Sequence, residues 1–247
     1  MTLPVLAIIA FSTLVTAFIS GILGMAGGMI LMGVLIALLP LPAAMMLHGI
    51  TQLASNTGRA MMLRKSIDWR VFRGYGIGVL LALAAFALVQ IVASKPVALI
   101  MLGLMPFIGF ALPEKLHLNV ERRFHSTACG AICTSLSLVA GVSGPVLDVF
   151  FIRSKMGRHA VVATKAITQS LTHLSKIIYF GAIVVATGGE VHPLAAALMV
   201  ALALIGTTLS RQVLERIDDT DFRLWTKWTV TAIGIVYLVS GVWQLVN

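Results

Sequence analysis

The sequence predicts an all-α polytopic membrane protein built from two inverted-topology repeats. Hydrophobic residues make up 59% of its 247 residues and charged residues only 11%, whereas about 25% of the residues of a soluble domain are charged. The mean hydropathy is +0.99. Several apolar runs reach the roughly 20 residues that a helix needs to cross a bilayer. Two of these runs are interrupted in the same style, by "GMAGG" at 24–28 and by "GVSGP" at 141–145.

The basic residues indicate which loops lie on which side of the membrane. A net charge of +9 could suggest nucleic acid, but no nucleic-acid-binding module is visible. The basic residues instead cluster in short loops, as the positive-inside rule requires of cytoplasmic loops. We therefore expect external turns at 39–42, 94–96 and 188–193, which carry little charge, and cytoplasmic loops at 64–73, 114–125, 153–159 and 211–223.

These sides define the order of the membrane segments. Six spans are expected, near residues 43–63, 74–93, 97–112, 160–186, 192–210 and 226–245. The remaining segments, 4–39 and 126–152, must each begin and end on one side, so each is expected to form a glycine-broken hairpin. The sequence leaves open whether these hairpins are re-entrant or cross fully.

Each repeat then holds one broken hairpin followed by about three transmembrane helices. We expect the first repeat at 1–113, a cytoplasmic linker at 114–125 and the second repeat at 126–247. Both termini are expected on the external side of a bacterial inner membrane.

An internal repeat is visible when the sequence is shifted by 117 residues. The shift aligns "ITQ" at 50–52 with "ITQ" at 167–169. Random drift in an apolar background would not favour polar positions, so these matches support inverted repeats. The other aligned pairs are Gly24 with Gly141, Gly27 with Gly144, Ser55 with Thr172, Asn56 with His173, and Arg59 with Lys176.

The glycine breaks predict an anion site. A break at bilayer depth is tolerated only where it is buried in protein or lines a polar cavity, and the resuming helix offers free N–H groups and a partial positive charge. We therefore expect backbone donors from Gly27, Gly28, Ser143 and Gly144. Close helix packing is the alternative role for these glycines. Pro145 argues against it, because proline cannot donate within a continuing helix.

The long helix after each break carries five polar residues spaced i, i+4, i+7, i+8 and i+11, which share one helical face. Such residues usually face a bundle interior or a water-filled pathway. We expect the Gln52 and Gln169 amides, near the midplane with the Thr51 and Thr168 hydroxyls, to bind an oxyanion. A snorkelling helix end is the alternative for Arg59. The two stripes are His48, Gln52, Ser55, Asn56 and Arg59, and Lys165, Gln169, Thr172, His173 and Lys176.

Three residues are candidates for carrying a proton. Asp148 is the main acidic candidate, and its first-half counterpart is Leu31. The sequence leaves open whether Asp148 titrates, pairs with Lys165, or forms an ion pair near Arg153. His48 and His173 are also candidates because histidine titrates near neutral pH, although buried packing histidines are the alternative. Cys129 and Cys133 are expected to be packing residues, and no metal or cofactor is expected.

The chain resembles the TauE/SafE family of sulfite and organosulfonate exporters along essentially its whole length. The resemblance is carried by "SGILGMAGGMI" at 20–30, "AGVSGPVLD" at 140–148, "HGITQLASNTGR" at 48–59 and "KAITQSLTHLSK" at 165–176. It implies transport of a small anion, typically a sulfur oxyanion or an organic acid, across a bacterial inner membrane.

The sequence therefore predicts a secondary transporter that works by alternating access, with a small anion and the lipid bilayer as partners. Protons as the coupling ion and a homo-oligomeric state stay open, and no nucleic-acid partner is expected. A membrane-embedded enzyme acting on a lipid-linked phosphate is the main alternative, but the predicted site is poor in the acids, bases and nucleophiles that catalysis needs. A passive anion channel also remains an alternative.

Overall fold

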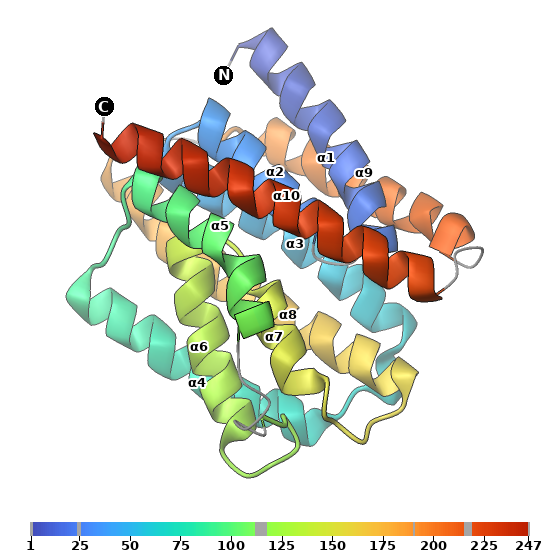
Figure 1. Ribbon diagram of the computed structural model, residues 1–247. Coiled ribbons are helices and arrows are strands. Elements are labelled where there is room, and N and C mark those ends of the chain that lie inside the picture. The colour runs from blue at the N-terminus through green and yellow to red at the C-terminus, as the bar shows by residue number, and fades with distance from the viewer. Residues whose placement is uncertain (1, 24–25, 112–117, 190, 215–218, 247) are drawn as a thin grey trace.

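The structure, a computed structural model, is a bundle of helices (Figure 1). It describes residues 2–23, 26–111, 118–189, 191–214 and 219–246, and this part of the chain contains no strand. The elements in order are α1 (Leu3–Leu23), α2 (Ala26–Leu38), α3 (Leu41–Met62), the short 3-10 helix η1 (Arg64–Ser66), α4 (Trp69–Val89), α5 (Lys95–Ala111), α6 (His125–Ala140), α7 (Gly144–Phe151), α8 (Arg158–Ala186), α9 (Pro193–Leu214) and α10 (Asp219–Val246).

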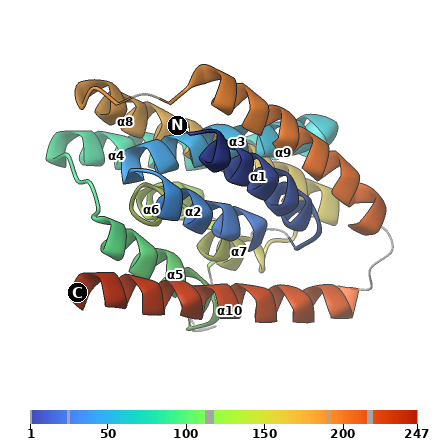
Figure 2. The same ribbon diagram turned by 90° about the horizontal axis from the view of Figure 1, so that it is seen from above.

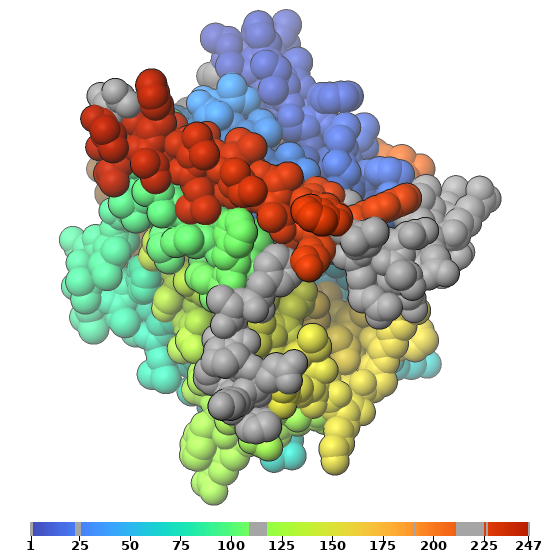
Figure 3. Space-filling model, viewed as in Figure 1, coloured from blue at the N-terminus to red at the C-terminus, as the bar shows by residue number. Residues whose placement is uncertain are grey.

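The helices have the lengths and surfaces of a membrane protein. Apolar stretches long enough to cross a bilayer lie in α1, α4, α9 and α10. Their outward side chains are apolar: Phe11, Leu80 and Val239 are all strongly exposed, which suits contact with lipid rather than water. Figure 3 shows α10 spread across one face of the molecule. The predicted all-α membrane fold is confirmed.

Both predicted helix breaks are present. The first separates α1 from α2, and Gly24 lies outside the described residues. The second separates α6 from α7 at residues 141–143. Gly141 has φ +83° and its N–H donates to the Ser137 carbonyl, 3.0 Å away. Glycine adopts this left-handed conformation at little cost, so it ends α6 here.

Two expected loops are shorter in the structure. Residues 211–223 were expected to form a loop, but α9 ends at Leu214 and α10 begins at Asp219. Residues 64–73 were expected to form a loop, but α4 begins at Trp69. The Asp68 carboxylate accepts hydrogen bonds from the N–H groups of Arg70 and Val71. This cap satisfies donors that the first turn of a helix leaves free, so α4 begins earlier than its apolar run.

The packing of the helices supports a two-repeat organisation. If α1–α5 correspond to α6–α10 in order, the α3–α8 and α5–α10 contacts each join equivalent helices. Under the same correspondence, α1 is equivalent to α6 and α9 to α4, so the α1–α9 contact in one place is equivalent to the α6–α4 contact in the other. Seen from above, α5 and α10 lie at one side of the bundle and α4, α8 and α9 at the other, with α2 and α7 between them (Figure 2). The repeat boundaries and the inverted orientation remain predictions.

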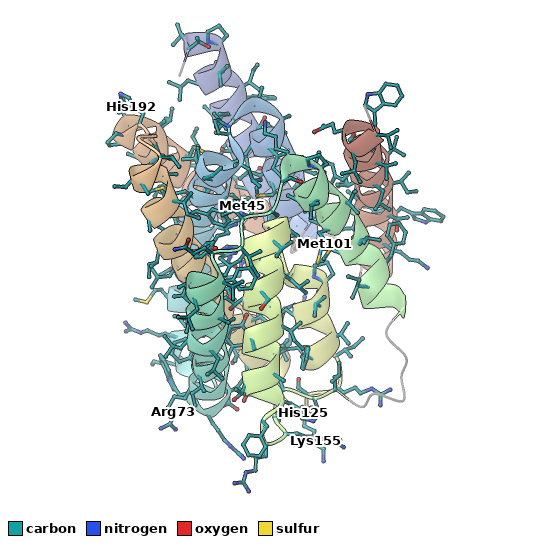
Figure 4. The ribbon with its side chains drawn as sticks, turned by 90° about the vertical axis from the view of Figure 1, so that its left-hand side faces the viewer. Met45, Arg73, Met101, His125, Lys155 and His192 are labelled. Carbon is teal, nitrogen blue, oxygen red and sulfur yellow. The ribbon has the colours of Figure 1, made fainter. Side chains whose placement is uncertain are left out.

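The predicted separation of the loops is visible at the two ends of the bundle. Arg73, His125 and Lys155, from three of the basic loops, lie at one end, and His192 lies at the opposite end (Figure 4). Both chain termini lie toward the same end as His192 (Figures 1 and 4). Three of the four basic segments are therefore gathered at one end of the bundle, as the positive-inside rule requires of a cytoplasmic face.

The contact between α4 and α6 generates a stability prediction. A Cβ added at Gly130 would overlap the Tyr75 backbone carbonyl of α4. Gly130→Ala is therefore expected to destabilise the protein by about 1–3 kcal/mol through overpacking. Thermal unfolding of the detergent-purified protein, followed by tryptophan fluorescence, measures this loss.

Gly157→Ala is the matched control, because nothing lies within 4 Å of a Cβ at this exposed position. It is expected to change the stability by less than about 0.5 kcal/mol. Equal melting temperatures for the two variants would contradict the close α4–α6 approach.

Candidate functional site

The two predicted polar stripes lie on α3 and α8, which pack against each other in opposite directions. His48 of α3 contacts Lys176 of α8, whereas Thr57, further along α3, donates to Ser170, an earlier residue of α8, over 3.1 Å. Gly49 allows the close approach: a Cβ there would lie 3.3 Å from the His173 carbonyl oxygen. The stripes therefore face each other across the junction of the two halves.

Three residues of these stripes form a histidine–lysine cluster: His48, His173 and Lys176. Their exposed fractions are 1%, 6% and 0%, and the two imidazole centroids are 5.8 Å apart. His48 Nε2 lies 2.9 Å from the Gly28 carbonyl oxygen. Because a carbonyl can only accept, Nε2 carries the hydrogen and donates, which leaves Nδ1 of the neutral ring as an acceptor.

Lys176 completes a hydrogen-bond chain between the two helix breaks. Its Nζ donates to His48 Nδ1 over 2.7 Å and to the Gly141 carbonyl over 2.8 Å. Gly141 belongs to the second break, and Gly28 lies in the first turn of α2, just after the first break. A Cβ at Gly141 would also meet the Met32 side chain of α2. The chain from Gly141 through Lys176 and His48 to Gly28 thus ties both broken hairpins to the α3–α8 pair.

A lysine–aspartate pair, Lys165 and Asp148, lies near the other end of the α8 stripe. The two side chains form an ion pair, with exposed fractions of 28% and 39%. Of the roles that the sequence left open for Asp148, the structure thus shows the contact with Lys165. Lys165 precedes Lys176 by eleven residues, which corresponds to about 16 Å along a helix. Cation–anion pairing is therefore present at one end of the stripes and absent from the histidine–lysine cluster at the other.

Arg59 lies at the level of this pair. Arg59 lies eleven residues after His48 on α3, and Lys165 lies eleven residues before Lys176 on α8. Because the two helices are antiparallel and His48 contacts Lys176, Arg59 and Lys165 lie at the same depth. Arg59 is half-buried and has no hydrogen bond or ion pair with any described residue. Its guanidinium is therefore available for an anion, with five N–H donors.

The remaining glycine and amide candidates occupy different environments. A Cβ at Gly28 would lie 3.6 Å from Gln52 Oε1, so Gln52 reaches the first turn of α2. Gly27 instead faces α1, where a Cβ would overlap Thr16 and Ser20, as the packing alternative requires. Gln169 is half-buried. Ser143 and Gly144, both buried, stand at the start of α7.

The hydroxyl candidates are engaged in hydrogen bonds within the protein. Thr51 and Thr168 donate to backbone carbonyls one turn earlier, 2.8 Å and 2.9 Å away. Such back-bonding is common for threonine in helices, and it means that these two hydroxyl hydrogens do not point toward an anion in this conformation. The other engaged side chains are Asn56, which donates to the Gln52 carbonyl, Ser55, bonded to Thr207, and Thr172, bonded to Tyr75.

Sequence reasoning missed two buried hydroxyl groups of α6, those of Thr134 and Ser137, although it did predict His173 as a site residue. Thr134 Oγ1 and Ser137 Oγ of α6 and Nδ1 of His173 are buried and have no hydrogen-bond partner. Ser137 lies one turn before Gly141, whose carbonyl accepts from Lys176. The spacing of Thr134 and Ser137 was the available signal, but it was weak, because helical hydroxyls usually bond their own backbone. Buried polar groups without partners mark places where a ligand or water binds.

The cluster itself is closed in this conformation. A cavity of about 190 Å³ lies between α2, α5 and α10, and none of the predicted site residues lines it. Among the described residues, no group of three histidine, cysteine, aspartate or glutamate side chains could hold a metal. Cys129 and Cys133 are buried, with their sulfur atoms 3.9 Å apart, as expected of packing residues.

Comparison with known proteins places this geometry in a family. Residues 9–237 match the family model described as "Sulfite exporter TauE/SafE". The chain belongs to the TauE/SafE family. The match includes both helix breaks, both polar stripes and the lysine–aspartate pair, and TauE/SafE is a family of membrane transporters. Among curated proteins and solved structures, no match to this TauE/SafE protein was found.

The lysine–aspartate pair generates a charge-balance prediction. Asp148→Asn leaves the Lys165 ammonium without its partner in the bundle, which is expected to lower the stability by roughly 1–3 kcal/mol. This is less than the 3–5 kcal/mol expected for a fully buried pair, because both groups keep some exposure. Thermal unfolding in detergent measures the effect.

The double variant Asp148→Asn/Lys165→Gln removes both charges and is expected to recover most of the lost stability. The contrary result would be a double variant whose loss of stability is at least the sum of the losses in Asp148→Asn and in Lys165→Gln. It would show that the two residues stabilise the protein independently.

Proposed function

We propose that this TauE/SafE protein is a secondary transporter for a small anion, such as sulfite, an organosulfonate or a related organic or sulfur oxyanion. The supporting observation is an imbalance of charge along the two stripes. Asp148 pairs with Lys165, whereas Lys176 and Arg59 contact no carboxylate among the described residues. Because cations at bilayer depth are costly without a partner, this imbalance favours an anionic substrate.

The proposed binding site lies between the two breaks and the α3–α8 pair. Gln52 lies beside Gly28, and Gln169 is its counterpart in the second half. The first turns of α2 and α7 supply backbone N–H groups and the positive ends of their helix dipoles. Arg59, Lys165 and Lys176 supply charge. Amide and backbone donors with cations nearby are what an oxyanion requires.

Alternating access would use the junction between the halves. The contacts from Lys176 to His48 and from Thr57 to Ser170 cross this junction. The histidine–lysine cluster is fully buried, so solvent reaches it only if the halves move apart. Discontinuous helices at the interface of two repeats are the usual arrangement for such rocking transporters.

The orientation of the protein follows from its charge distribution. We infer that the end carrying Arg73, His125 and Lys155 faces the cytoplasm of a bacterial cell, with both termini external and the inner membrane as the location. Single cysteines on a background without Cys129 and Cys133 test this orientation. Ser94→Cys is expected to react with a membrane-impermeant maleimide in intact cells, whereas Lys65→Cys is expected to react only after lysis. The opposite pattern would invert the topology.

Transport itself is tested by uptake into proteoliposomes of labelled sulfite, thiosulfate, methanesulfonate and short carboxylates. Saturable uptake of at least one anion is expected. Gln52→Ala and Gln169→Ala are each expected to weaken its apparent affinity by about tenfold or more, because a hydrogen bond to a charged group contributes about 1.5–3 kcal/mol.

Gln244→Ala, on the exposed surface of α10, is the matched control and is expected to transport like the unaltered protein. Transport that survives both stripe substitutions unchanged would exclude the proposed binding site. Uptake of none of these anions would refute anion transport.

A further inference from the structure

We propose that Lys176 carries the proton that crosses the membrane together with the anion, so that a monovalent anion is moved without net charge. This inference rests on the proposed function and assigns its coupling group. Three features of the cluster support it: the hydrogen bonds of Lys176, the lack of a carboxylate beside it among the described residues, and the polar atoms nearby that have no partner.

The number of hydrogen-bond donors on Lys176 differs between its neutral and its protonated form. Its Nζ has two acceptors, His48 Nδ1 and the Gly141 carbonyl oxygen. A neutral amine has two N–H groups, which these acceptors satisfy completely. An ammonium group has three, so one N–H and a full positive charge would be left without a partner. The empty site therefore suits the neutral lysine, and the protonated lysine requires a further acceptor.

Lys176 has no counter-charge beside it in the part of the chain that the structure describes. The elements packed against α8 include α3, α4, α6 and η1. Among the described residues, the titratable groups of these elements on the side of Lys176 are uncharged or basic, and none is a carboxylate. Lys176 is 0% exposed, so water does not compensate its charge, and an unpaired buried charge costs several kcal/mol. The basic residues of η1, Arg64 and Lys65, lie toward the opposite end of α8, where the Asp68 N–H donates to Thr164. The titratable groups on the side of Lys176 are His48 on α3, Tyr75 on α4, Cys129 and Cys133 on α6, and His173 on α8.

The other end of the stripes shows how the fold neutralises a permanent cation. There Lys165 has Asp148. Under the 117-residue shift, His48 corresponds to Lys165 and Leu31 to Asp148. The histidine–lysine cluster thus lacks the acidic residue at the equivalent position. The negative charge that would stabilise protonated Lys176 must come from the transported anion.

Two buried polar atoms without a hydrogen-bond partner belong to residues close to Lys176 or to its acceptor Gly141 along their helices. His173, one helical turn earlier on the same face, is buried and its Nδ1 has no hydrogen-bond partner. Ser137 Oγ, one turn before Gly141, is likewise unpartnered. Both can donate to an oxyanion bound beside the ammonium group. Polar atoms that the protein itself leaves unpaired near a buried amine favour the binding of a polar ligand there.

These observations describe a cycle with two permitted states. In one, Lys176 is neutral and the site is empty. In the other, the amine has taken up a proton to become an ammonium, and the anion lies beside it. Each state has a net charge of zero in the cluster. A proton without the anion, or an anion without the proton, would leave one uncompensated charge in the bundle. The two species are therefore expected to bind, cross and leave together.

The test uses methanesulfonate in proteoliposomes that contain the full chain. This sulfonate is the anion of a strong acid, so any proton that moves with it must be carried by the protein. The unaltered protein is expected to accumulate labelled methanesulfonate when a pH gradient is imposed. A membrane potential set with potassium and valinomycin is expected to have no effect.

Two variants of Lys176 separate its charge from its proton. Lys176→Gln has no charge, and Lys176→Arg has a charge that does not titrate. Both are expected to lose at least about tenfold of the pH-driven accumulation. Their residual net uptake of labelled methanesulfonate into vesicles that contain none is expected to become sensitive to the membrane potential, because each complete cycle then moves one net charge. Lys155→Gln, in an exposed loop, is the matched control and is expected to keep the behaviour of the unaltered protein.

The outcomes distinguish this inference from the proposed function. Transport of methanesulfonate that ignores the pH gradient would overturn the inference and leave anion transport in place. Retention of pH-driven accumulation by Lys176→Arg, with its loss in His173→Gln, would assign the proton to His173 and also overturn the inference. An unaltered protein that takes up no anion at all would overturn both.

Discussion

The architecture depends on holding a buried lysine between two interrupted helices. An interrupted helix exposes backbone groups that lipid cannot satisfy, and a buried amine needs acceptors that apolar helices do not offer. At the second break both requirements are met by one contact, because the Gly141 carbonyl at the end of α6 accepts from Lys176. At the first break, His48 donates to the Gly28 carbonyl in the first turn of α2. The polar residues of α3 and α8 and the backbone of the two breaks therefore form one connected unit. The surrounding helices α4, α6, α1 and α9 enclose it with close, glycine-mediated contacts.

The sequence predicted those features that arise from local pattern or from the internal repeat. Helix breaks follow from glycine and proline propensities, and the buried stripes follow from helical periodicity. The lysine–aspartate pair was one of three roles considered for Asp148, because both partners lie in the same half near a break. The family followed from the same motifs, and the match over residues 9–237 bears it out.

The sequence could not predict contacts that depend on how the two halves meet. Contact between His48 and Lys176 requires α3 and α8 to be antiparallel with one particular register, which neither helix specifies alone. The role of Gly27 in packing against α1 and that of Thr51 in bonding its own helix depend on side-chain direction at single positions. Tyr75 was overlooked because a tyrosine in an apolar helix looks like a packing residue until its hydroxyl partner, Thr172, is known. In this protein, periodicity defined the polar surfaces, and tertiary register determined which groups on them touch.

The unequal ends of the stripes have a consequence for the working cycle. In a perfectly repeated transporter, exchanging the conformations of the two halves would turn the outward-facing state into an equivalent inward-facing one, and the two states would have equal free energy. Here Asp148 has Leu31 as its counterpart, and α7 has 8 residues where α2 has 13. The exchange therefore does not reproduce the same set of interactions. Under the proposed alternating access, the unloaded protein would therefore have a preferred resting side, and the membrane face that first meets the substrate would depend on these departures from symmetry rather than on the shared motifs.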